Sequence, residues 1–349
     1  MDLQIAAILF QDGIANGAIY TMLALGFVLI FTTTRIIFAS YGDLIALSAL
    51  TLHSLQNDRL PGTVVLIVML ATFATLGECW SLLRSGARRK VPAAVLLWFV
   101  APLVPAAASF ALQGAELAAG AQILLTIALV TPLAPLLHRV VFRPIESSST
   151  LTLLIVALVL HYAIAGFALL VFGAEGVRAA PLLRGSIDIL GVSIGVQVAV
   201  FVIVAAALSA GLAAYFNVTL SGKALRATAY NSYGARLVGI STQRSATAAF
   251  LLAGLIASII GILIGPTVTI YYDSGLMIGL KGFVGAVLGG FVSYPLAALG
   301  SVSIALVEAY ASFFASSYKE IIVFLSIIPI ILLRWTGARH DVEEEEEHA

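Results

Sequence analysis

Six side chains that can carry a charge or a proton lie inside long apolar stretches of this 349-residue chain: Asp43, His53, Glu78, His161, Lys281 and Glu308. An ionisable group at the centre of a membrane-spanning helix costs on the order of 2.5–3.5 kcal/mol on insertion scales, so it should face the protein interior or water. Such groups could carry a proton or an ion, or they could hydrogen-bond one helix to another. For Asp43 and Glu308, which lie well inside their stretches, both interpretations stay open and we favour hydrogen bonding.

The other ionisable groups lie closer to the ends of their apolar stretches. We expect His53 and Glu78 at the membrane interface. Lys281 is about one helical turn from the outer end of its stretch, so its long side chain could extend to the lipid headgroups.

Signatures of nucleotide binding and of enzyme chemistry are missing. A phosphate loop requires G-x-x-x-x-G-K-[ST]. The only Gly-Lys pair, Gly222-Lys223, has Asn217 in place of the first glycine and Ala224 in place of the hydroxyl residue. The chain also has no H-E-x-x-H pattern, and Cys79 is its only cysteine. We therefore predict no catalytic residue, no metal ligand and no enzyme activity.

The elements that position these groups must be membrane helices. Apolar residues form 61% of the chain and charged residues 10%, against roughly 25% charged in soluble domains. A spanning helix needs about 20 apolar residues, and such runs recur along the sequence. We predict an all-α polytopic membrane protein, a bundle of about eleven transmembrane helices. The predicted spans lie near 3–31, 36–56, 61–80, 91–112, 120–141, 151–173, 196–216, 246–265, 276–294, 297–316 and 318–335.

The distribution of Lys and Arg predicts the orientation of the bundle. Alternate loops hold 13 of the 18 basic residues, and the opposite loops hold only Arg59, Arg178, Arg184 and Lys319. Because basic loops stay in the cytoplasm, we predict an outside N-terminus and an inside C-terminus. Residues 1–336 form the predicted transmembrane domain, and 337–349 an acidic, disordered tail. The basic residues lie in short loops, as expected of topology determinants, so nucleic acid is not an expected partner.

The longest predicted cytoplasmic loop, 217–245, has the composition of a docking element. Residues 223–238 are predicted to form one short amphipathic helix between Gly222 and Gly239. A helix this short is marginal in water alone, so we expect a partner to pack on it, although a solvated loop without a partner is the alternative. The apolar anchors would be Leu225 and Leu237, with a polar rim of Lys223, Arg226 and Arg236.

Small residues recur at helical spacing in two later spans, at Gly254, Ser258, Gly261 and Gly265, and at Gly282, Gly285 and Gly289. Small residues allow helix backbones to approach closely in a membrane. We therefore expect these faces to be packing faces in a tight bundle.

Several motifs together resemble one family of membrane proteins. Residues 16–26 read NGAIYTMLALG, and Gly42-Asp43 follows. Arg139-Val140-Val141-Phe142-Arg143-Pro144 is similar to an R-x-x-[YF]-R-P turn, and residues 222–240 to a G-[RK]-A-x-R-A…L-x-G-I loop. Lys281-Gly282-Phe283 and Glu308-Ala309 complete the pattern. Over residues 11–56 and 120–336 the chain resembles the permease subunits of branched-chain amino acid ABC transporters of the leucine/isoleucine/valine type.

The resemblance implies a subunit of a bacterial importer in the cytoplasmic (inner) membrane. Its implied partners are a second permease, homologous or identical, two ATP-binding cassette ATPases, an extracytoplasmic solute-binding protein and membrane lipid. ATP and Mg are expected on the ATPases and no cofactor on this chain. The solute would be small and neutral or zwitterionic, a branched-chain or related amino acid. The implied docking loop contains Gly222, Lys223, Leu225, Arg226, Leu237 and Gly239, and candidate pathway or interior polar residues are Asn16, Tyr20, Tyr41, Asp43, Lys281 and Glu308.

Three departures from the family pattern are visible. Phe38-Ala39-Ser40-Tyr41 replaces a stretch with asparagine and histidine, which could change what the pathway accepts. Tyr230-Asn231 replaces an acidic pair in the docking loop, which could change the ATPase contact. Residues 57–119 are interpreted as an inserted two-span hairpin at the periphery of the bundle.

A self-sufficient secondary carrier or channel is the rival function. It would use Asp43, Lys281 and Glu308 as ion or proton sites and would need no ATPase. Copurification of an ATPase with the chain would separate the two hypotheses.

Overall fold

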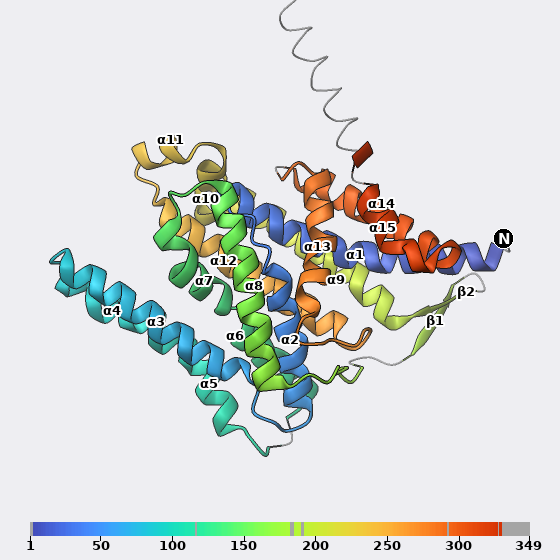
Figure 1. Ribbon diagram of the computed structural model, residues 1–349, viewed down its shortest axis with the longest axis horizontal. Helices are drawn as coiled ribbons and strands as arrows, with labels where there is room; N and C mark the ends of the chain where they lie inside the picture. Colours follow the sequence, from blue (N-terminus) through green and yellow to red (C-terminus); the bar gives the residue numbers. More distant parts are fainter. Residues whose placement is uncertain are drawn as a thin grey trace, which may run out of the picture. The chain divides into compact units, whose positions relative to one another are not determined.

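Helices dominate the computed structural model, which describes residues 3–115, 117–181, 185–189, 192–291, 293–326 and 328–329 (Figure 1). Within these residues, eight helical segments are long and apolar enough to cross a membrane. The prediction of a polytopic helical membrane protein is confirmed. The α-helices are α1 Leu3–Thr34, α2 Tyr41–Gln56, α3 Thr63–Arg84, α4 Val91–Val95, α5 Ala101–Ala111, α6 Ala119–Val130, α7 Leu133–Leu137, α8 Thr150–Phe172, α9 Val196–Val218, α10 Leu220–Tyr230, α11 Ser232–Leu237, α12 Thr242–Ile264, α13 Ser274–Leu288, α14 Tyr294–Phe314 and α15 Lys319–Leu325.

Short irregular turns extend or join several of these helices. The 3-10 turns are η1 Arg88–Lys90, η4 Arg143–Ile145 and η5 Ser316–Tyr318, and the π-helical turns are η2 Leu96–Val100 and η3 His138–Phe142. The eight long segments match eight of the predicted spans. The other three predicted spans correspond to shorter helices, α2 with 16 residues, α13 with 15 and α15 with 7. Much of the predicted last span, and the predicted tail 337–349, lie outside the described residues.

The chain divides into two compact units, and three helices contribute to both. The first unit comprises Leu29–Leu183 and Leu208–Leu280. Its centre is α2, which packs against α12, α6 and α8. The Ser48 hydroxyl donates to the Ser258 carbonyl at 2.7 Å, and Gly261 lies directly against the backbone of Ile45. The predicted small-residue packing face of this span is confirmed.

The second unit comprises Met1–Val28, Arg184–Ala207 and Lys281–Ala349. Glycines of α1 and α13 let these helices approach α14 closely, with Gly17 against Val302 and Gly285 against Ser301. Val284, Leu288, Ile304 and Val323 form an apolar core that joins α13, α14 and α15. The second predicted set of small residues, on α13, is therefore also a packing face.

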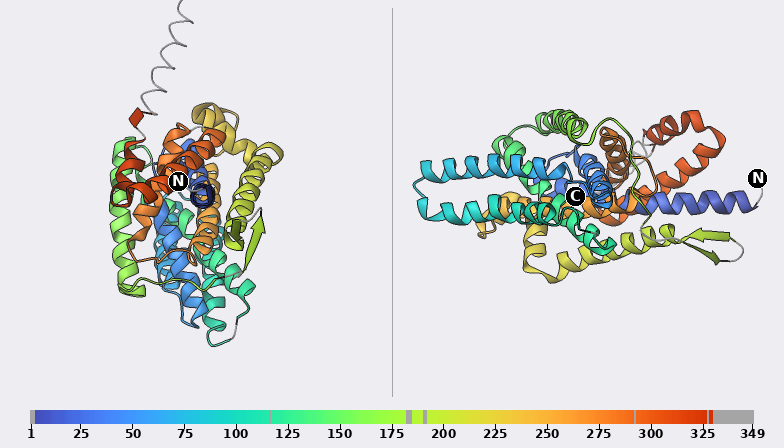
Figure 2. Two further views of the ribbon diagram at one scale, coloured as in Figure 1. Left: turned by 90° about the vertical axis from the view of Figure 1, so that its right-hand side faces the viewer. Right: turned by 90° about the horizontal axis from the view of Figure 1, so that it is seen from below.

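The predicted inserted hairpin is a pair of antiparallel helical rods within the first unit. Figures 1 and 2 show α3 lying alongside the continuous run of α4, η2 and α5, and these elements contact each other along their length. Large apolar side chains point away from the protein on both rods, including Phe73, Leu76, Leu96 and Val104. Such exposed apolar surface is compatible with contact to lipid.

A short hairpin departs from the all-helical prediction. Strands β1 Ser186–Ile189 and β2 Val192–Gly195 pair antiparallel, with Ser186 opposite Gly195. The sequences SIDI and VSIG alternate β-branched with small or polar residues, a pattern typical of strands. The hairpin occupies one of the longer connections between predicted spans.

The predicted single helix over 223–238 is two helices, α10 and α11. Thr219 caps α10 by accepting a hydrogen bond from the Gly222 amide at 2.9 Å. Asn231 interrupts the helix with extended backbone (φ −150°) and caps α11 by accepting from the Gly234 amide at 2.9 Å. The left-handed φ of +84° at Gly239 follows α11. We call residues 217–240 the α10–α11 segment.

Candidate functional site

Glu308 on α14 is the centre of a buried polar cluster. Tyr20 of α1 donates a hydrogen bond from Oη to Glu308 Oε2 at 2.6 Å, and Lys281 Nζ of α13 donates to Glu308 Oε1 at 2.6 Å. The ammonium also lies 5.5 Å from the centroid of the Tyr20 ring. Both Tyr20 and Glu308 are buried, so the carboxylate joins three helices and is balanced by one cation. The expectation that Lys281 extends to the headgroups is wrong, because its side chain turns to Glu308.

Asp43 of α2 forms a second buried cluster with His161 of α8. Asp43 Oδ1 and His161 Nδ1 lie 2.8 Å apart, and both side chains are less than 5% exposed. Asp43 Oδ2 is buried without a hydrogen-bond partner among the described residues. Glycines 42 and 275 bring the backbones together here, since Gly275 lies against Asp43.

The remaining candidate polar residues lie near these clusters in the sequence. Tyr41 is fully buried and donates from its hydroxyl to the Ala253 carbonyl at 3.2 Å, while Ser40 donates to Ala157 at 2.6 Å. The stretch in which this chain departs from the family pattern is therefore packed inside the protein. Asn16 lies one turn before Tyr20 on α1 and is half-buried.

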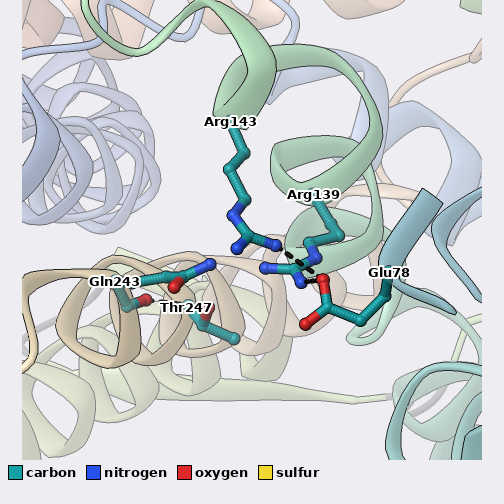
Figure 3. A network of polar contacts seen from close by, with 5 residues as sticks. All are labelled: Glu78, Arg139, Arg143, Gln243 and Thr247. Carbon is teal, nitrogen blue, oxygen red and sulfur yellow. Dashed lines mark hydrogen bonds and ion pairs between the residues drawn. The ribbon is translucent and has the colours of Figure 1, made fainter. Parts of the chain in front are cut away.

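Glu78 of α3 belongs to a third cluster, which the sequence interpretation missed. Its carboxylate forms ion pairs with Arg139 and Arg143, the latter at 2.8 Å (Figure 3). With its amide oxygen facing the guanidinium groups, Gln243 of α12 accepts hydrogen bonds from both arginines. The side chains of Glu78 and Arg139 are 16% and 6% exposed, so the carboxylate is paired within the protein, and its interfacial depth stays a prediction. His53, also expected at the interface, contacts the Arg178 carbonyl at 3.1 Å.

An aromatic ring of the hairpin contacts Arg139 of this third cluster. The Arg139 guanidinium lies 5.1 Å from the centroid of the Trp98 ring, so η2 of the hairpin contacts it as well. The neighbouring His138 is buried and stacks on Phe250 at 4.5 Å between ring centroids. One sequence signal could have indicated this cluster: Glu78 is the only acid between Asp58 and Glu116.

The α10–α11 segment has one face packed on its own chain and one face that is exposed in the part of the chain that the structure describes. Leu225 is 2% exposed, and Thr228 Oγ1 donates to Ser245 Oγ of α12 at 3.1 Å. Lys223 and Arg226 are exposed. Arg226 also donates to Asn217 Oδ1 at 2.7 Å. Gly222 lies against the backbone of Tyr215 without room for a Cβ.

The prediction that Leu225 and Leu237 both anchor a partner protein is wrong for Leu225. Leu225 packs into its own chain and cannot fill a groove on another protein from this position. Leu237 is 73% exposed, and Tyr230, Tyr233 and Val238 are 94%, 72% and 74% exposed. These four residues form what we call the exposed docking face.

Long apolar helices joined by buried polar clusters define a polytopic membrane protein. Residues 9–333 match a family model described as the permease component of the branched-chain amino acid transport system, and the chain belongs to this family. Members of this family are transport components, so the chain is not an enzyme.

The curated relatives carry the same description. The chain is 30% identical over 217 residues to the high-affinity branched-chain amino acid transport system permease protein LivH of Salmonella typhimurium, covering 60% of this chain and 70% of that protein. The LivH protein of Escherichia coli matches to the same extent. The BraD permease protein of Pseudomonas aeruginosa is 28% identical over 218 residues, covering 60% of this chain and 71% of BraD. No solved structure matches the chain.

Proposed function

We propose that this chain is the membrane-spanning permease subunit of an ABC importer in the bacterial inner membrane. Its substrate is a small neutral or zwitterionic solute, a branched-chain or related amino acid. Family membership supports the permease role. The substrate class is supported by the relatives LivH and BraD, which are named as branched-chain amino acid transport permeases. Buried ionisable groups that pair with each other also fit a pathway for a solute without net charge.

The observation that carries the ATP-driven mechanism is the exposed docking face. The α10–α11 segment is fixed to α12 on one side, and it presents two tyrosines and two aliphatic residues on the other. Residues 217–245 contain four basic residues and no acid. A partner with an apolar groove and an acidic rim would be complementary to this surface. In the proposal that partner is one of two ATPases, which hold ATP and Mg, and a second permease and a solute-binding protein complete the importer.

The proposed topology has about eleven spans, with the N-terminus outside and the C-terminus inside. Three observations support it: the eight long helical segments, the shorter helices at the other predicted positions, and the alternation of basic loops. The exposed apolar faces of α3 and α5 support a peripheral position for the extra hairpin within 57–119.

The secondary carrier is retained as a second candidate because Asp43 Oδ2 has no partner among the described residues. An unpartnered buried carboxylate oxygen could bind a cation or a proton. The opposing observation is that Glu308 and Lys281 are paired with each other and are therefore not free ion sites.

Reconstitution in proteoliposomes separates these two functions. The chain is purified with its cognate permease, ATPases and binding protein, and uptake of radiolabelled leucine is measured with ATP inside the vesicles. We expect uptake that requires ATP and the binding protein and that persists when ionophores remove ion gradients. Uptake by the chain alone, abolished by the ionophores, would establish the carrier instead.

A further inference from the structure

We propose that Glu78 is a positioning residue that ties the α3–α5 hairpin to the α10–α11 segment, so that the two move together during transport. The inference rests on the proposed function, because it concerns how a force on the exposed docking face reaches the bundle. It assigns a role to the hairpin that the family resemblance does not cover.

The first link joins the hairpin to the turn before α8. Glu78 comes from α3, and the two arginines that it binds come from η3 and η4. Trp98, on the second rod of the hairpin, adds a cation–π contact to Arg139. Both rods therefore hold the same arginine. Because the ion pair is largely removed from water, it is little screened by salt and has a defined geometry.

The second link joins the arginines to the start of α12. Gln243 lies in the first turn of that helix, beside the arginines (Figure 3), and with its amide oxygen turned toward them it accepts from both guanidinium groups. One carboxylate, two guanidinium groups and one amide thus connect three separate elements of the same unit.

The third link joins α12 to the α10–α11 segment. Thr228 of α10 donates to Ser245 at 3.1 Å, and Arg236 of α11 donates from Nε to Thr242 Oγ1 at 3.2 Å. Thr242 and Ser245 flank Gln243 on the first turn of α12. A displacement of α10 and α11 therefore acts on the same helical turn that the arginines hold.

The ion pairs of Glu78 hold the arginine turn in one arrangement against the hairpin. With Glu78 in place, one of the two guanidinium charges is balanced and the arginines stay close to the hairpin. Without that carboxylate, Arg139 would be a buried charge lacking its acid, which is strongly unfavourable, so the turn would have to move. The hairpin thus holds the turn through which a displacement of the α10–α11 segment is transmitted. Weakening this contact should uncouple ATP hydrolysis from solute movement.

The test is the ratio of solute taken up to ATP hydrolysed in the reconstituted importer. Glu78→Gln keeps the size of the side chain and removes its charge, and Gln243→Met breaks the second link while leaving the ion pairs. We expect both variants to lower the ratio at least ~5-fold, the lower end of typical coupling between sites, with normal ATPase copurification. The exchange Glu78→Arg with Arg143→Glu keeps the net charge and should restore most of the ratio.

Glu146→Gln is the matched control. Glu146 is exposed and lies beside the same arginine turn, but it belongs to neither the hairpin nor α12. The Glu146→Gln variant removes one negative charge near Arg143 and should leave the ratio of solute taken up to ATP hydrolysed unchanged.

Each result decides the proposal. If Glu78→Gln and Gln243→Met are well folded and keep the wild-type ratio, the hairpin is not part of the coupling and the inference is wrong. If Glu78→Gln does not fold, Gln243→Met and the charge exchange still decide. Failure of the proposed function itself looks different, because the wild-type protein would then show no ATP-dependent uptake.

Discussion

At the scale of single residues, Glu308 gives the clearest separation between a structural and a transport role. Its two oxygens bind Tyr20 and Lys281, so an amide of the same shape can retain contacts that an aliphatic side chain cannot. We predict that Glu308→Gln folds and keeps most uptake, whereas Glu308→Leu is recovered in much lower yield. Detergent-solubilised protein on size-exclusion chromatography and uptake in vesicles measure the two effects. Complete loss of uptake in a folded Glu308→Gln protein would show that the charge itself is used.

The Tyr20 hydroxyl donates to a charged, buried acceptor, and hydrogen bonds to charged groups contribute about 1.5–3 kcal/mol. We predict that Tyr20→Phe lowers the thermal unfolding temperature by several degrees. Tyr162→Phe is the control, because Tyr162 is 66% exposed on α8 and should unfold like the wild type. Equal unfolding temperatures for the two variants would argue against the Tyr20–Glu308 bond in the membrane protein.

The sequence indicated which ionisable residues lie inside the protein, but not which residues they pair with. Asp43 and Glu308 were recognisable because a carboxylate stands out in an apolar run. Their partners lie 118 residues away at His161 and 288 residues away at Tyr20, and no periodicity connects such positions. The cluster around Glu78 was missed because its partners, Arg139 and Arg143, were assigned only to a cytoplasmic loop in the predicted topology.

At the scale of elements, the α10–α11 segment separates a folding residue from a docking residue. Leu225 is buried in its own chain, so Leu225→Asp would bury an unpaired charge and should destabilise the protein by about 4 kcal/mol or more. Leu237 is on the exposed docking face, where truncation of an anchor typically costs about 2 kcal/mol or more. We predict that Leu237→Asp inserts and folds normally but reduces ATPase copurification roughly 30-fold in affinity.

Two controls make this comparison decisive. Thermal unfolding of Leu225→Asp should fall while that of Leu237→Asp stays at the wild-type value. Arg226→Ala should reduce ATPase binding less, and in a salt-dependent way, because exposed charge pairs are screened. Normal ATPase association of Leu237→Asp would remove the exposed docking face from the interface.

Packing faces were easier to predict than helix ends. Gly254 and Gly261 indicated a close contact between helices because small residues at helical spacing in a membrane are typical of packing faces. Both glycines lie against the backbone of a neighbouring segment. The break between α10 and α11 was missed, although Asn231 three residues before Gly234 is a capping pattern. The composition of residues 223–238 is compatible with one helix, and only the extended backbone at Asn231 separates α10 from α11.

At the scale of the whole molecule, the topology is the property that most needs a direct test. We predict that cysteines at Ser85 and Glu175, in a Cys79→Ser background, are labelled by an impermeant reagent from opposite sides of the membrane. Glu175 is used rather than its neighbour Gly176, whose Cβ would meet the Tyr271 ring at 2.6 Å. Labelling of both positions from one side would show that the predicted alternation of basic loops is wrong.

The approximate places of the long helices followed from the length of the apolar runs, since a bilayer demands about 20 residues per crossing. Where helices are shorter, the run was interrupted for local reasons. Arg35 has a left-handed φ of 59°, and residues 35–40 are not helical. Consequently α2 begins at Tyr41 rather than near 36. The length of an apolar run does not predict a non-helical turn of this kind inside it.

The shortness of α2 has a consequence for bilayer thickness. Its 16 residues extend about 24 Å at about 1.5 Å per residue, less than the ~30 Å of a typical hydrocarbon core. Almost all of its residues are buried, so its ends meet protein instead of acyl chains. Exposed helices such as α8, with 23 residues, must tilt when the bilayer becomes thinner. The centre of this unit is thereby shielded from hydrophobic mismatch, and lipid chain length should change the tilt of the outer helices before it disturbs the contacts of α2 with α12.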